Sequence, residues 1–260
     1  MTEQIFSQKR AEQNLARAYA MDMDRFLLDD ITQSFADRLA FMTRKFEKPC
    51  EYSQCPPIAL KCSLDAVHAR RLEEVPSGCD LIIAPLILDL AEDPLSLLVH
   101  LRSKLAPDGM LLTACLGEQN LADLRARLME LEMAVTGGAA ARFHPRMALQ
   151  DLARLAVAAG LALPVADKEI LKVRYQNMFR LARDLRAHGL NICLHDVRPM
   201  RRDVVALANQ QFFGPKSEAL TFEILYLAAF APSPDQPKPK APGSAQVSMA
   251  QALASKNDQR

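Results

Sequence analysis

The segment from Cys79 to Leu116 constrains the fold more than any other part of the sequence. It begins with a continuous apolar run, CDLIIAPLIL, which is typical of a strand buried on both faces of a parallel sheet. The helical pattern DPLSLLVHLRSKL and the turn APDG follow, and a second apolar run, MLLTACL, completes the unit. A strand, a helix and a second strand in this order predict an α/β fold with helices on the faces of the sheet.

Helical periodicity dominates the sequence before this unit. Apolar spacing predicts one helix over residues 8–19 and a second over residues 26–42. A third helix is expected in SLDAVHARRLEEV, residues 63–75, with Ser63 or Asp65 as its N-cap. These helices lead into the strand that begins at Cys79.

The sequence after the unit continues the alternation of helices and strands. Helices are expected at residues 120–135, 148–160, 176–189 and 201–213, and strands at 161–175 and 220–232. We therefore divide the chain into a helical lead-in (1–45), an α/β domain (46–232) and a tail (233–260). The tail is rich in Pro, Lys, Gln and Ser and is expected to be disordered, with residues 249–254 able to form one helical turn on a partner.

Charge and composition exclude several classes of function. Lys and Arg number 32 and Asp and Glu 31, so the net charge of +1 gives no overall attraction to nucleic acid or an acidic membrane. The longest apolar run, residues 81–88, is far shorter than the roughly 20 residues of a membrane-spanning helix. Residues 1–24 carry no basic and apolar leader pattern, which predicts a cytoplasmic location.

The cysteines and histidines give no clear metal or nucleophile pattern. The six cysteines include no C-x-x-C pair, so no disulfide is required. A zinc site from Cys50, Cys55, Cys62 and His68 is an alternative, but its spacing matches no recurrent zinc frame, and we expect no metal. The chain also lacks the G-x-S-x-G, Walker and H-E-x-x-H motifs, so no catalytic residue is assigned.

Four stretches together resemble a known superfamily. They are IFSQKRAEQNLARAYAMDMDRFLLDDITQSFADRL, the segment CDLIIAPLIL through NLADLR, LKVRYQNMFRLARDLRAHGLN, and TFEILYLAAFAP. In this order they resemble the class I S-adenosylmethionine-dependent methyltransferases. The nearest branch contains the biotin-synthesis malonyl-carrier-protein methyltransferases and the complex I assembly factor that hydroxylates an arginine. The resemblance covers most of residues 5–232 and implies a Rossmann-like α/β fold with a doubly wound sheet of seven strands.

The resemblance also implies a glycine-rich loop, similar to D-x-G-x-G-x-G, after the first strand. Glycines are needed there because the backbone approaches the cofactor closely and adopts positive φ. In this chain the first glycine is Gly78, and the stretch PCEYSQCPPIALKCS stands in place of the loop. We expect this proline-rich stretch to replace the first strand, its loop and the following helix, leaving at most a short strand at residues 58–64 and a shortened sheet.

The candidate cofactor residues lie around the two apolar strands. In the superfamily an acidic residue after the second strand binds the ribose, and Asp65 is the nearby candidate, with a helix cap as the alternative. Ala84 and Leu86 end the first apolar run. Asp89, in LDL where this branch tends to have L-H-W, points to the carboxyl end of the sheet or is a surface carboxylate.

The candidate substrate or partner residues lie after residue 170. Tyr175, Arg183 and Arg186 belong to the segment where the superfamily tends to build its substrate cover. Arg198 and Arg201 lie in DVRPMRRD and would suit a carboxylate or phosphate, with the solvated first turn of a helix as the alternative.

Two functions follow from these expectations. The first is a methyltransferase-like pseudoenzyme with no bound cofactor, which acts by binding a protein partner in an assembly or scaffold role. The alternative is an active S-adenosylmethionine-dependent methyltransferase or related hydroxylase with an atypical cofactor pocket. A shortened sheet exposes an edge strand, so a homodimer is a further expectation.

Overall fold

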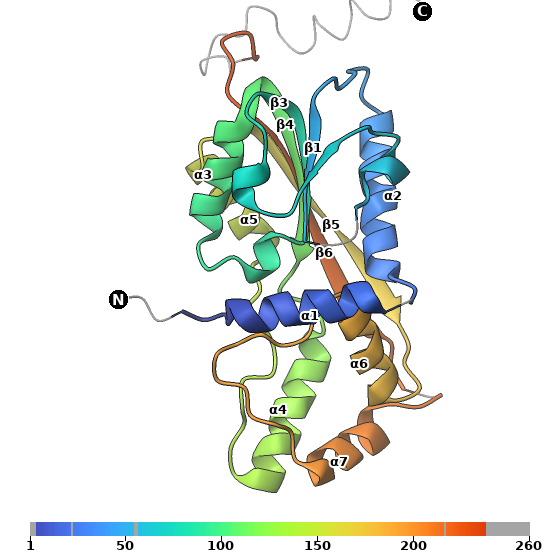
Figure 1. Ribbon diagram of the computed structural model, residues 1–260. Helices are drawn as coiled ribbons and strands as arrows, with labels where there is room; N and C mark the ends of the chain where they lie inside the picture. The colour runs from blue at the N-terminus through green and yellow to red at the C-terminus, as the bar shows by residue number, and fades with distance from the viewer. Residues whose placement is uncertain (1–3, 22, 55–56, 216, 238–260) are drawn as a thin grey trace, which may run out of the picture.

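The computed structural model describes residues 4–21, 23–54, 57–215 and 217–237. The expected disorder of the tail from residue 238 onward, and the helical turn at residues 249–254, lie outside the described residues. Within the described parts the chain forms a mixed α/β fold (Figure 1). The α/β fold predicted from the sequence is thus confirmed.

A sheet of six strands forms the centre of the described structure. The strand order is β2-β1-β3-β4-β6-β5, with β1 to β4 mutually parallel and β6 antiparallel to both of its neighbours. The strands are β1 (Pro49–Tyr52), β2 (Val67–Ala69), β3 (Cys79–Pro85), β4 (Leu105–Leu116), β5 (Ala162–Val173) and β6 (Leu220–Phe230). The described sheet is one strand shorter than the seven-stranded pattern, as the sequence led us to expect.

Seven α-helices surround this sheet in the described part of the chain. They are α1 (Gln8–Ala20), α2 (Phe26–Ala40), α3 (Pro94–Lys104), α4 (Ala122–Thr136), α5 (Leu149–Ala158), α6 (Met178–Ala187) and α7 (Arg202–Phe212). In Figure 1, α2 covers one face of the sheet and α3 and α5 cover the other. Helix α1 crosses the carboxyl ends of the parallel strands, and α4, α6 and α7 lie beyond that end.

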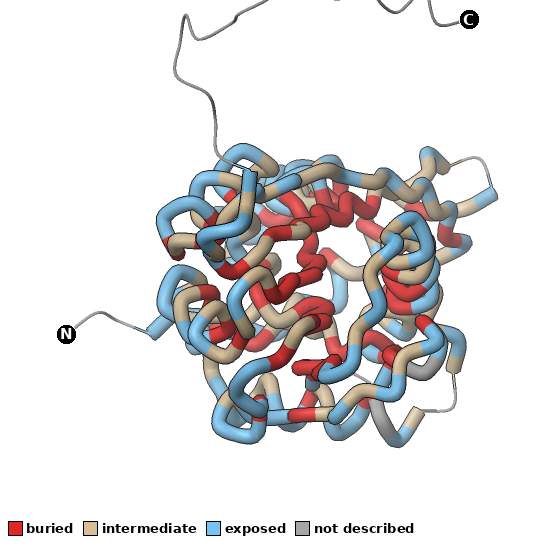
Figure 2. Tube along the Cα trace, turned by 90° about the horizontal axis from the view of Figure 1, so that it is seen from above, coloured by how far each residue is buried: buried red, intermediate tan, exposed pale blue. Residues whose placement is uncertain are grey.

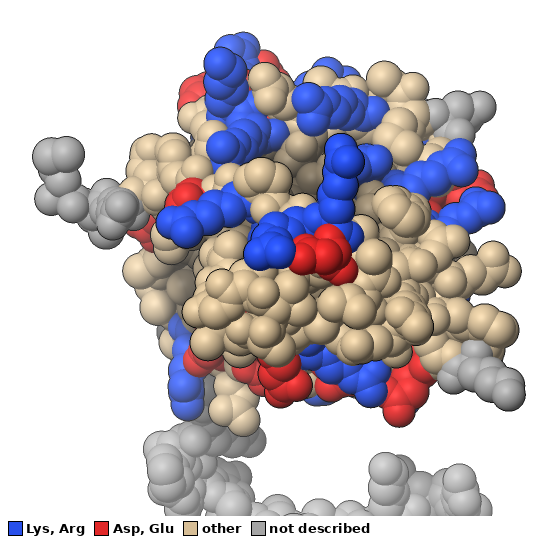
Figure 3. Space-filling model, turned by 90° about the horizontal axis from the view of Figure 1, so that it is seen from below, with Lys and Arg blue, Asp and Glu red and all other residues tan. Residues whose placement is uncertain are grey.

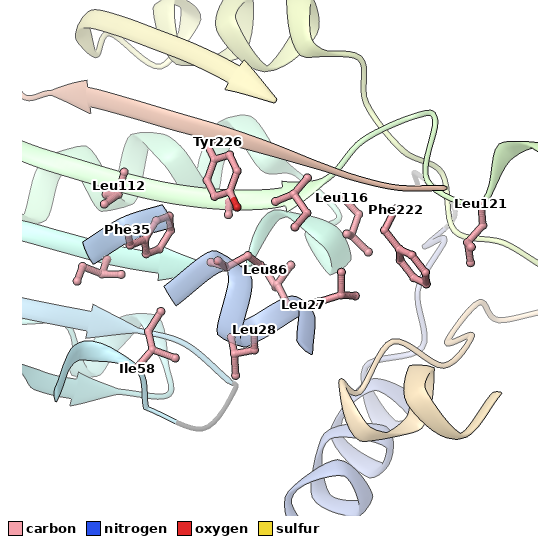
Figure 4. Close-up of a cluster of buried hydrophobic side chains, with 14 of the residues drawn as sticks. Leu27, Leu28, Phe35, Ile58, Leu86, Leu112, Leu116, Leu121, Phe222 and Tyr226 are labelled. Carbon is pink, nitrogen blue, oxygen red and sulfur yellow. The ribbon is translucent and has the colours of Figure 1, made fainter. Parts of the chain in front are cut away.

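The core has two layers because successive residues of a strand face opposite sides of the sheet. On β3, Leu81 and Ile83 pack into the cluster under α2, whereas Ile82 packs into the cluster under α3 and α5. Buried segments run through the middle of the molecule and exposed residues form its outside (Figure 2). In the cluster under α2, the rings of Phe35 and Tyr226 lie 6.1 Å apart (Figure 4). Apolar contact on both faces explains why the continuous run at β3 was a reliable signal.

The prediction that the proline-rich stretch replaces the first strand is wrong. Residues 49–52 form β1, which lies between β2 and β3 in the sheet and is buried along its whole length. Pro49 is the first residue of the strand, a position at which the missing N–H is tolerated. The short strand expected at residues 58–64 is also absent, and a 3₁₀ helix, η1 (Ala59–Cys62), lies there instead.

The helix expected at residues 63–75 is likewise wrong. The segment forms β2 and a short 3₁₀ helix, η2 (Leu72–Glu74). Strand β2 pairs with β1 through Cys50 and Val67, and this pairing overrides the helical periodicity of the segment. The remaining helices and strands occur where the sequence predicted them, with ends shifted by a few residues. The strand expected at residues 110–116 begins at Leu105, so the turn predicted at residues 106–109 lies within β4.

None of the helices in the described residues combines the length and the apolar character needed to cross a membrane.

Candidate functional site

Open α/β sheets bind ligands beyond the carboxyl ends of their strands. In this structure a small cavity of about 170 Å³ lies there, beyond the ends of β1 and β3. Its walls come from the end of β1, the residues after β3, helix α3, helix α1 and the turn after α6. The lining residues are Leu15, Tyr52, Gln54, residues 85–87, residues 89–91, Leu97 and residues 188–190. We call this space the β1–β3 cavity.

Helix α1 and the turn after α6 close the β1–β3 cavity from outside. Gly189 adopts φ of +70°, and a Cβ there would lie 2.9 Å from Cδ2 of Leu15. Two hydrogen bonds hold α1 in this position: the Asn14 Nδ2 donates to the Asn191 carbonyl at 3.1 Å, and the Ser7 N–H donates to the Cys193 carbonyl at 2.7 Å. The lead-in helix therefore forms one wall of the β1–β3 cavity.

A buried carboxylate holds the segment that replaces the glycine-rich loop. Glu51 of β1 is fully buried and accepts hydrogen bonds from the Ser53 hydroxyl at 2.7 Å, the Ile58 N–H at 2.8 Å and the Ala59 N–H at 2.7 Å. The sequence E-Y-S at residues 51–53 matches the D-x-G start of the superfamily motif, with serine in place of glycine. Our sequence reasoning missed Glu51, although this spacing was available to identify it.

The residues around the β1–β3 cavity do not fit S-adenosylmethionine. Ser53 stands at the first glycine position, and the segment after β1 contains no glycine at all. Pockets for ligands of this size usually measure about 300–1,000 Å³, and this cavity is smaller. A cofactor would need α1 or the 188–190 turn to move.

The predicted cofactor residues are only partly brought together. Leu86, with φ of +57°, lines the β1–β3 cavity, whereas Ala84 lies inside the sheet, where its carbonyl accepts a hydrogen bond from the Thr113 hydroxyl. Asp65 is exposed and precedes β2, and Arg70 follows β2 at the position expected for the ribose-binding acid. The structure thus separates Asp65 from the other candidates.

Asp89 is buried, so its alternative reading as a surface carboxylate is wrong. Its side chain forms an ion pair with Arg146 and accepts a hydrogen bond from the Leu116 N–H at 3.1 Å. Burial raises the pKa of the Asp89 carboxyl to about 6, although Arg146 and the Leu116 N–H act in the opposite direction. This pair links the end of β3 to the loop before α5.

A second and larger cavity, of about 440 Å³, lies between α4 and α6 beyond the end of β4. Most of its lining residues are apolar: Leu116, Leu121, Leu124, Leu128, Phe143, Met178, Phe179, Leu181, Ala182, Leu185, Leu190, Ile192, Met200 and Val205. Four arginines and the polar residues Asn120, His144 and Asn191 complete the wall. Figure 3, which views the molecule from the end that carries α4, α6 and α7, shows Lys and Arg side chains gathered around a hollow. We call this space the arginine-lined cavity.

The four arginines of this cavity differ in their partners. Arg142 pairs with Glu132, and Arg146 pairs with Asp89. Arg125 of α4 and Arg186 of α6 form no side-chain hydrogen bond or ion pair with any residue that the structure describes. Two positive charges on facing helices are thus left available at one cavity.

The other predicted substrate or partner residues are dispersed. Arg183 is exposed, and its Nε donates to the Met23 sulfur at 3.0 Å. Tyr175 is buried against the ring of Phe222, and burial raises the pKa of its hydroxyl. Arg186 alone of the predicted residues lines the arginine-lined cavity.

Arg198 and Arg201 do not form a clamp. Arg198 is exposed and lies 3.8 Å from the Asp196 carboxylate, while Arg201 pairs with Asp203 in the first turn of α7 at 2.5 Å. The alternative reading, a solvated helix start, describes these two residues better.

His144 and Cys193 form a buried contact beside the arginine-lined cavity. His144 Nε2 accepts the Cys193 N–H at 2.9 Å and lies 3.4 Å from the Cys193 sulfur. Burial lowers the pKa of the imidazole to about 4 and raises the pKa of the thiol to about 11. Both groups are therefore neutral at pH 7, unlike the charged pair of a nucleophilic cysteine, and the contact is structural.

This contact predicts a loss of stability in acid. Burial lowers the pKa of His144 from 6.5 to about 4. The neutral side chain therefore makes its full contribution to the free energy of unfolding above pH 6.5, and this contribution declines as the pH falls toward 4. The full decline is about 3 kcal/mol of unfolding free energy. Urea denaturation of the wild type and of His144→Asn at pH 7, 6, 5 and 4 measures this decline. The other titrating groups are the same in both proteins, so the difference between the two pH profiles reports His144. Parallel pH profiles for the two proteins would contradict the assignment.

The zinc alternative finds no support in the described residues. They contain no group of three or more His, Cys, Asp or Glu side chains arranged to hold a metal ion. Cys55, one of the proposed ligands, lies outside the described residues.

Two groups of curated proteins are similar to this chain. No protein-family model matches the chain. The arginine hydroxylase NDUFAF5, mitochondrial, of Danio rerio is 28% identical over 209 residues, covering 72% of this chain and 65% of that protein. The protein of the same name from Dictyostelium discoideum is 31% identical over 173 residues, covering 64% of this chain and 40% of that protein.

A malonyl-[acyl-carrier protein] O-methyltransferase of Xylella fastidiosa is 25% identical over 171 residues, covering 64% of this chain and 56% of that protein. The chain thus spans 65% or less of the length of these three relatives. Among solved structures, phosphoethanolamine N-methyltransferase 2 of Haemonchus contortus aligns at 11% identity with a TM-score of 0.41, covering 78% of this chain and 52% of that one. A TM-score below 0.5 does not establish a shared fold.

The relatives overturn the expected cytoplasmic location. The proteins of Danio rerio, Dictyostelium discoideum, Mus musculus and Homo sapiens are all named as mitochondrial. The expectation rested on the composition of residues 1–24 alone, which does not determine a compartment.

Two independent observations agree with the resemblance to this superfamily. The parallel strands β2, β1, β3 and β4, followed by antiparallel β6, reproduce the doubly wound sheet that the resemblance implied. The curated relatives include the two activities of the branch that the sequence resembled. The chain is therefore similar in sequence to members of the class I S-adenosylmethionine-dependent methyltransferase superfamily.

Proposed function

We propose that this protein is a methyltransferase-like pseudoenzyme that does not use S-adenosylmethionine and acts by binding another protein, in an assembly or scaffold role. The observation that carries the proposal is the β1–β3 cavity. It measures about 170 Å³, lacks the glycine cradle, and is covered by α1 and Gly189. An enzyme of this superfamily needs that space for its methyl donor.

Exposed apolar side chains near α4 and α6 support a protein-binding role. Met129 and Met133 lie one turn apart on α4 and are 56% and 52% exposed, and Phe179 of α6 is 68% exposed. Methionine and aromatic side chains adapt well to partner surfaces. This end of the molecule is thus our candidate for the partner-binding surface.

The alternative is an active S-adenosylmethionine-dependent methyltransferase or related hydroxylase with an atypical pocket. Two observations favour it: the names of the curated relatives and the volume of the arginine-lined cavity, about 440 Å³. Methyl transfer depends mainly on aligning donor and acceptor, so the lack of an assigned catalytic residue does not count against activity.

Calorimetric titration with S-adenosylmethionine and S-adenosylhomocysteine distinguishes the two functions. We expect no saturable heat up to millimolar ligand and no rise in melting temperature, with an active methyltransferase as positive control. A ligand at 100 times its dissociation constant would add about 2.7 kcal/mol of stability, which a thermal shift detects. A micromolar dissociation constant would contradict the proposal.

A variant with a filled β1–β3 cavity shows where any observed S-adenosylmethionine binding takes place. Leu90→Arg fills the β1–β3 cavity and leaves the arginine-lined cavity unchanged, since Leu90 lines only the former of these two. Binding that is lost in this variant belongs to the superfamily's usual cofactor place. Binding that persists belongs elsewhere and supports the atypical pocket.

A further inference from the structure

We propose that the arginine-lined cavity binds a small amphipathic molecule with an anionic head group and an apolar body. This inference is independent of the proposed function, because it concerns a different cavity and a ligand other than S-adenosylmethionine. It rests on the apolar wall, on two arginines without partners, and on one buried amide without a hydrogen bond.

The apolar wall selects the body of the ligand. At about 440 Å³ the cavity falls within the usual range of small-molecule sites, about 300–1,000 Å³. Leucine, isoleucine, methionine and phenylalanine side chains from α4, α6 and the end of β4 dominate its lining. Each methylene group buried there gains about 0.8 kcal/mol by leaving water. A purely polar anion would not use this surface.

The two arginines select the head group. Arg125 and Arg186 line the cavity from α4 and α6 and have no ion-pair partner among the described residues. By contrast, the charges of Arg142 and Arg146 are balanced by Glu132 and Asp89. Guanidinium groups bind carboxylate and phosphate through paired, charge-assisted hydrogen bonds. A carboxylate or a phosphate therefore fits between the two helices.

Asn120 adds a third, independent indication of a ligand. The residue lines the same cavity and is only 7% exposed, and its Oδ1 is buried without a hydrogen-bond partner in the described structure. Leu121 is the N-cap residue of α4, so Asn120 does not cap this helix. Buried polar atoms in folded proteins are nearly always hydrogen-bonded. A hydroxyl group on the ligand would satisfy this oxygen.

The probes for the test separate these three contributions. Octanoate carries both the head group and the apolar body, 1-octanol lacks the charge, acetate lacks the body, and 3-hydroxyoctanoate adds a donor for Asn120. Octyl phosphate compares a phosphate head with the carboxylate. Isothermal titration of the full chain should give saturable binding of octanoate, about tenfold weaker binding of octanol and no binding of acetate.

Matched variants test the arginines. Arg125→Gln and Arg186→Gln should each weaken octanoate binding about tenfold and leave octanol binding unchanged. Arg127→Gln is the control, because Arg127 lies on the same helix but pairs with Glu218 outside the cavity. Asn120→Leu should remove any advantage of 3-hydroxyoctanoate over octanoate. Circular dichroism confirms that each variant is folded.

Either of two results with octanoate would overturn the proposal: no saturable binding at millimolar concentration, or equal affinity in the wild type and both arginine variants. Tight binding of acetate alone would also overturn it, since it would show a simple anion site. S-adenosylmethionine is absent from these titrations. Failure here therefore leaves the proposed function standing, and failure of the proposed function leaves this inference standing.

Discussion

Replacing Arg146 by Met is expected to lower the free energy of unfolding by about 3 kcal/mol at pH 7. The side chains of Arg146 and Asp89 are 9% and 1% exposed and form an ion pair beyond the end of β3. Methionine fills similar space but leaves the Asp89 carboxylate buried without its cation. Urea denaturation followed by circular dichroism measures the loss.

The loss should shrink in mild acid. Without Arg146 the pKa of Asp89 rises further above its ordinary value of 3.8, because burial then acts with less opposition. A raised carboxyl pKa makes the folded state bind a proton more tightly than the unfolded state, so the variant gains stability as the pH falls from 7 toward 5. The double variant Asp89→Leu, Arg146→Met removes both charges and should recover most of the loss, with no such pH dependence. A loss below about 0.5 kcal/mol for Arg146→Met would show that the pair is not an important buried contact.

Replacing Glu51 by Leu is expected to lower the free energy of unfolding by about 4 kcal/mol. The substitution leaves the N–H groups of Ile58 and Ala59 without their acceptor and removes one partner of the Ser53 hydroxyl, which also lies 3.2 Å from His68 Nε2. Each buried donor left unpaired costs about 1–3 kcal/mol. Chemical denaturation measures the change, and hydrogen exchange at Ile58 and Ala59 reports whether the segment after β1 is released.

Glu51→Gln is the matched control. Its amide oxygen can still accept hydrogen bonds from two of the three donors, so the expected loss is about 1–2 kcal/mol. A similar, small loss in both variants would contradict the role of Glu51 in holding this segment. A release of the segment together with new S-adenosylmethionine binding would contradict the pseudoenzyme proposal as well.

The sequence alone determined the parts of the fold whose signals are local. The apolar runs of β3 and β4 and the strand β6 were all identified from consecutive residues, whereas the turn expected at residues 106–109 lies within β4. Each is long enough to carry its own periodicity, and each packs against both layers of the core. The Pro94 that begins α3 follows an Asp93 side chain that accepts the Ser96 N–H at 3.0 Å, so this helix start also is determined locally.

The short strands could not be predicted because they depend on partners. Strand β1 has four residues and β2 has three, too few for a reliable pattern. Their conformation comes from pairing with each other and with β3, and from the acceptor that Glu51 offers to backbone groups 7 and 8 residues away. The proline-rich composition of the stretch pointed away from a central strand.

The candidate site likewise combines features that the sequence determined with features that only the tertiary structure decided. The sequence determined that a glycine cradle is missing, because residue type alone decides whether a backbone can adopt it. It also identified Leu86 and Asp89 as cofactor candidates and Arg186 as a substrate or partner candidate, and each of the three lines one of the two cavities. Only the tertiary structure decided that Asp89 is buried against Arg146, 57 residues away. The placement of α4 and α6 around one space likewise created the arginine-lined cavity, since a cavity is a property of how distant elements fill space and has no local signature.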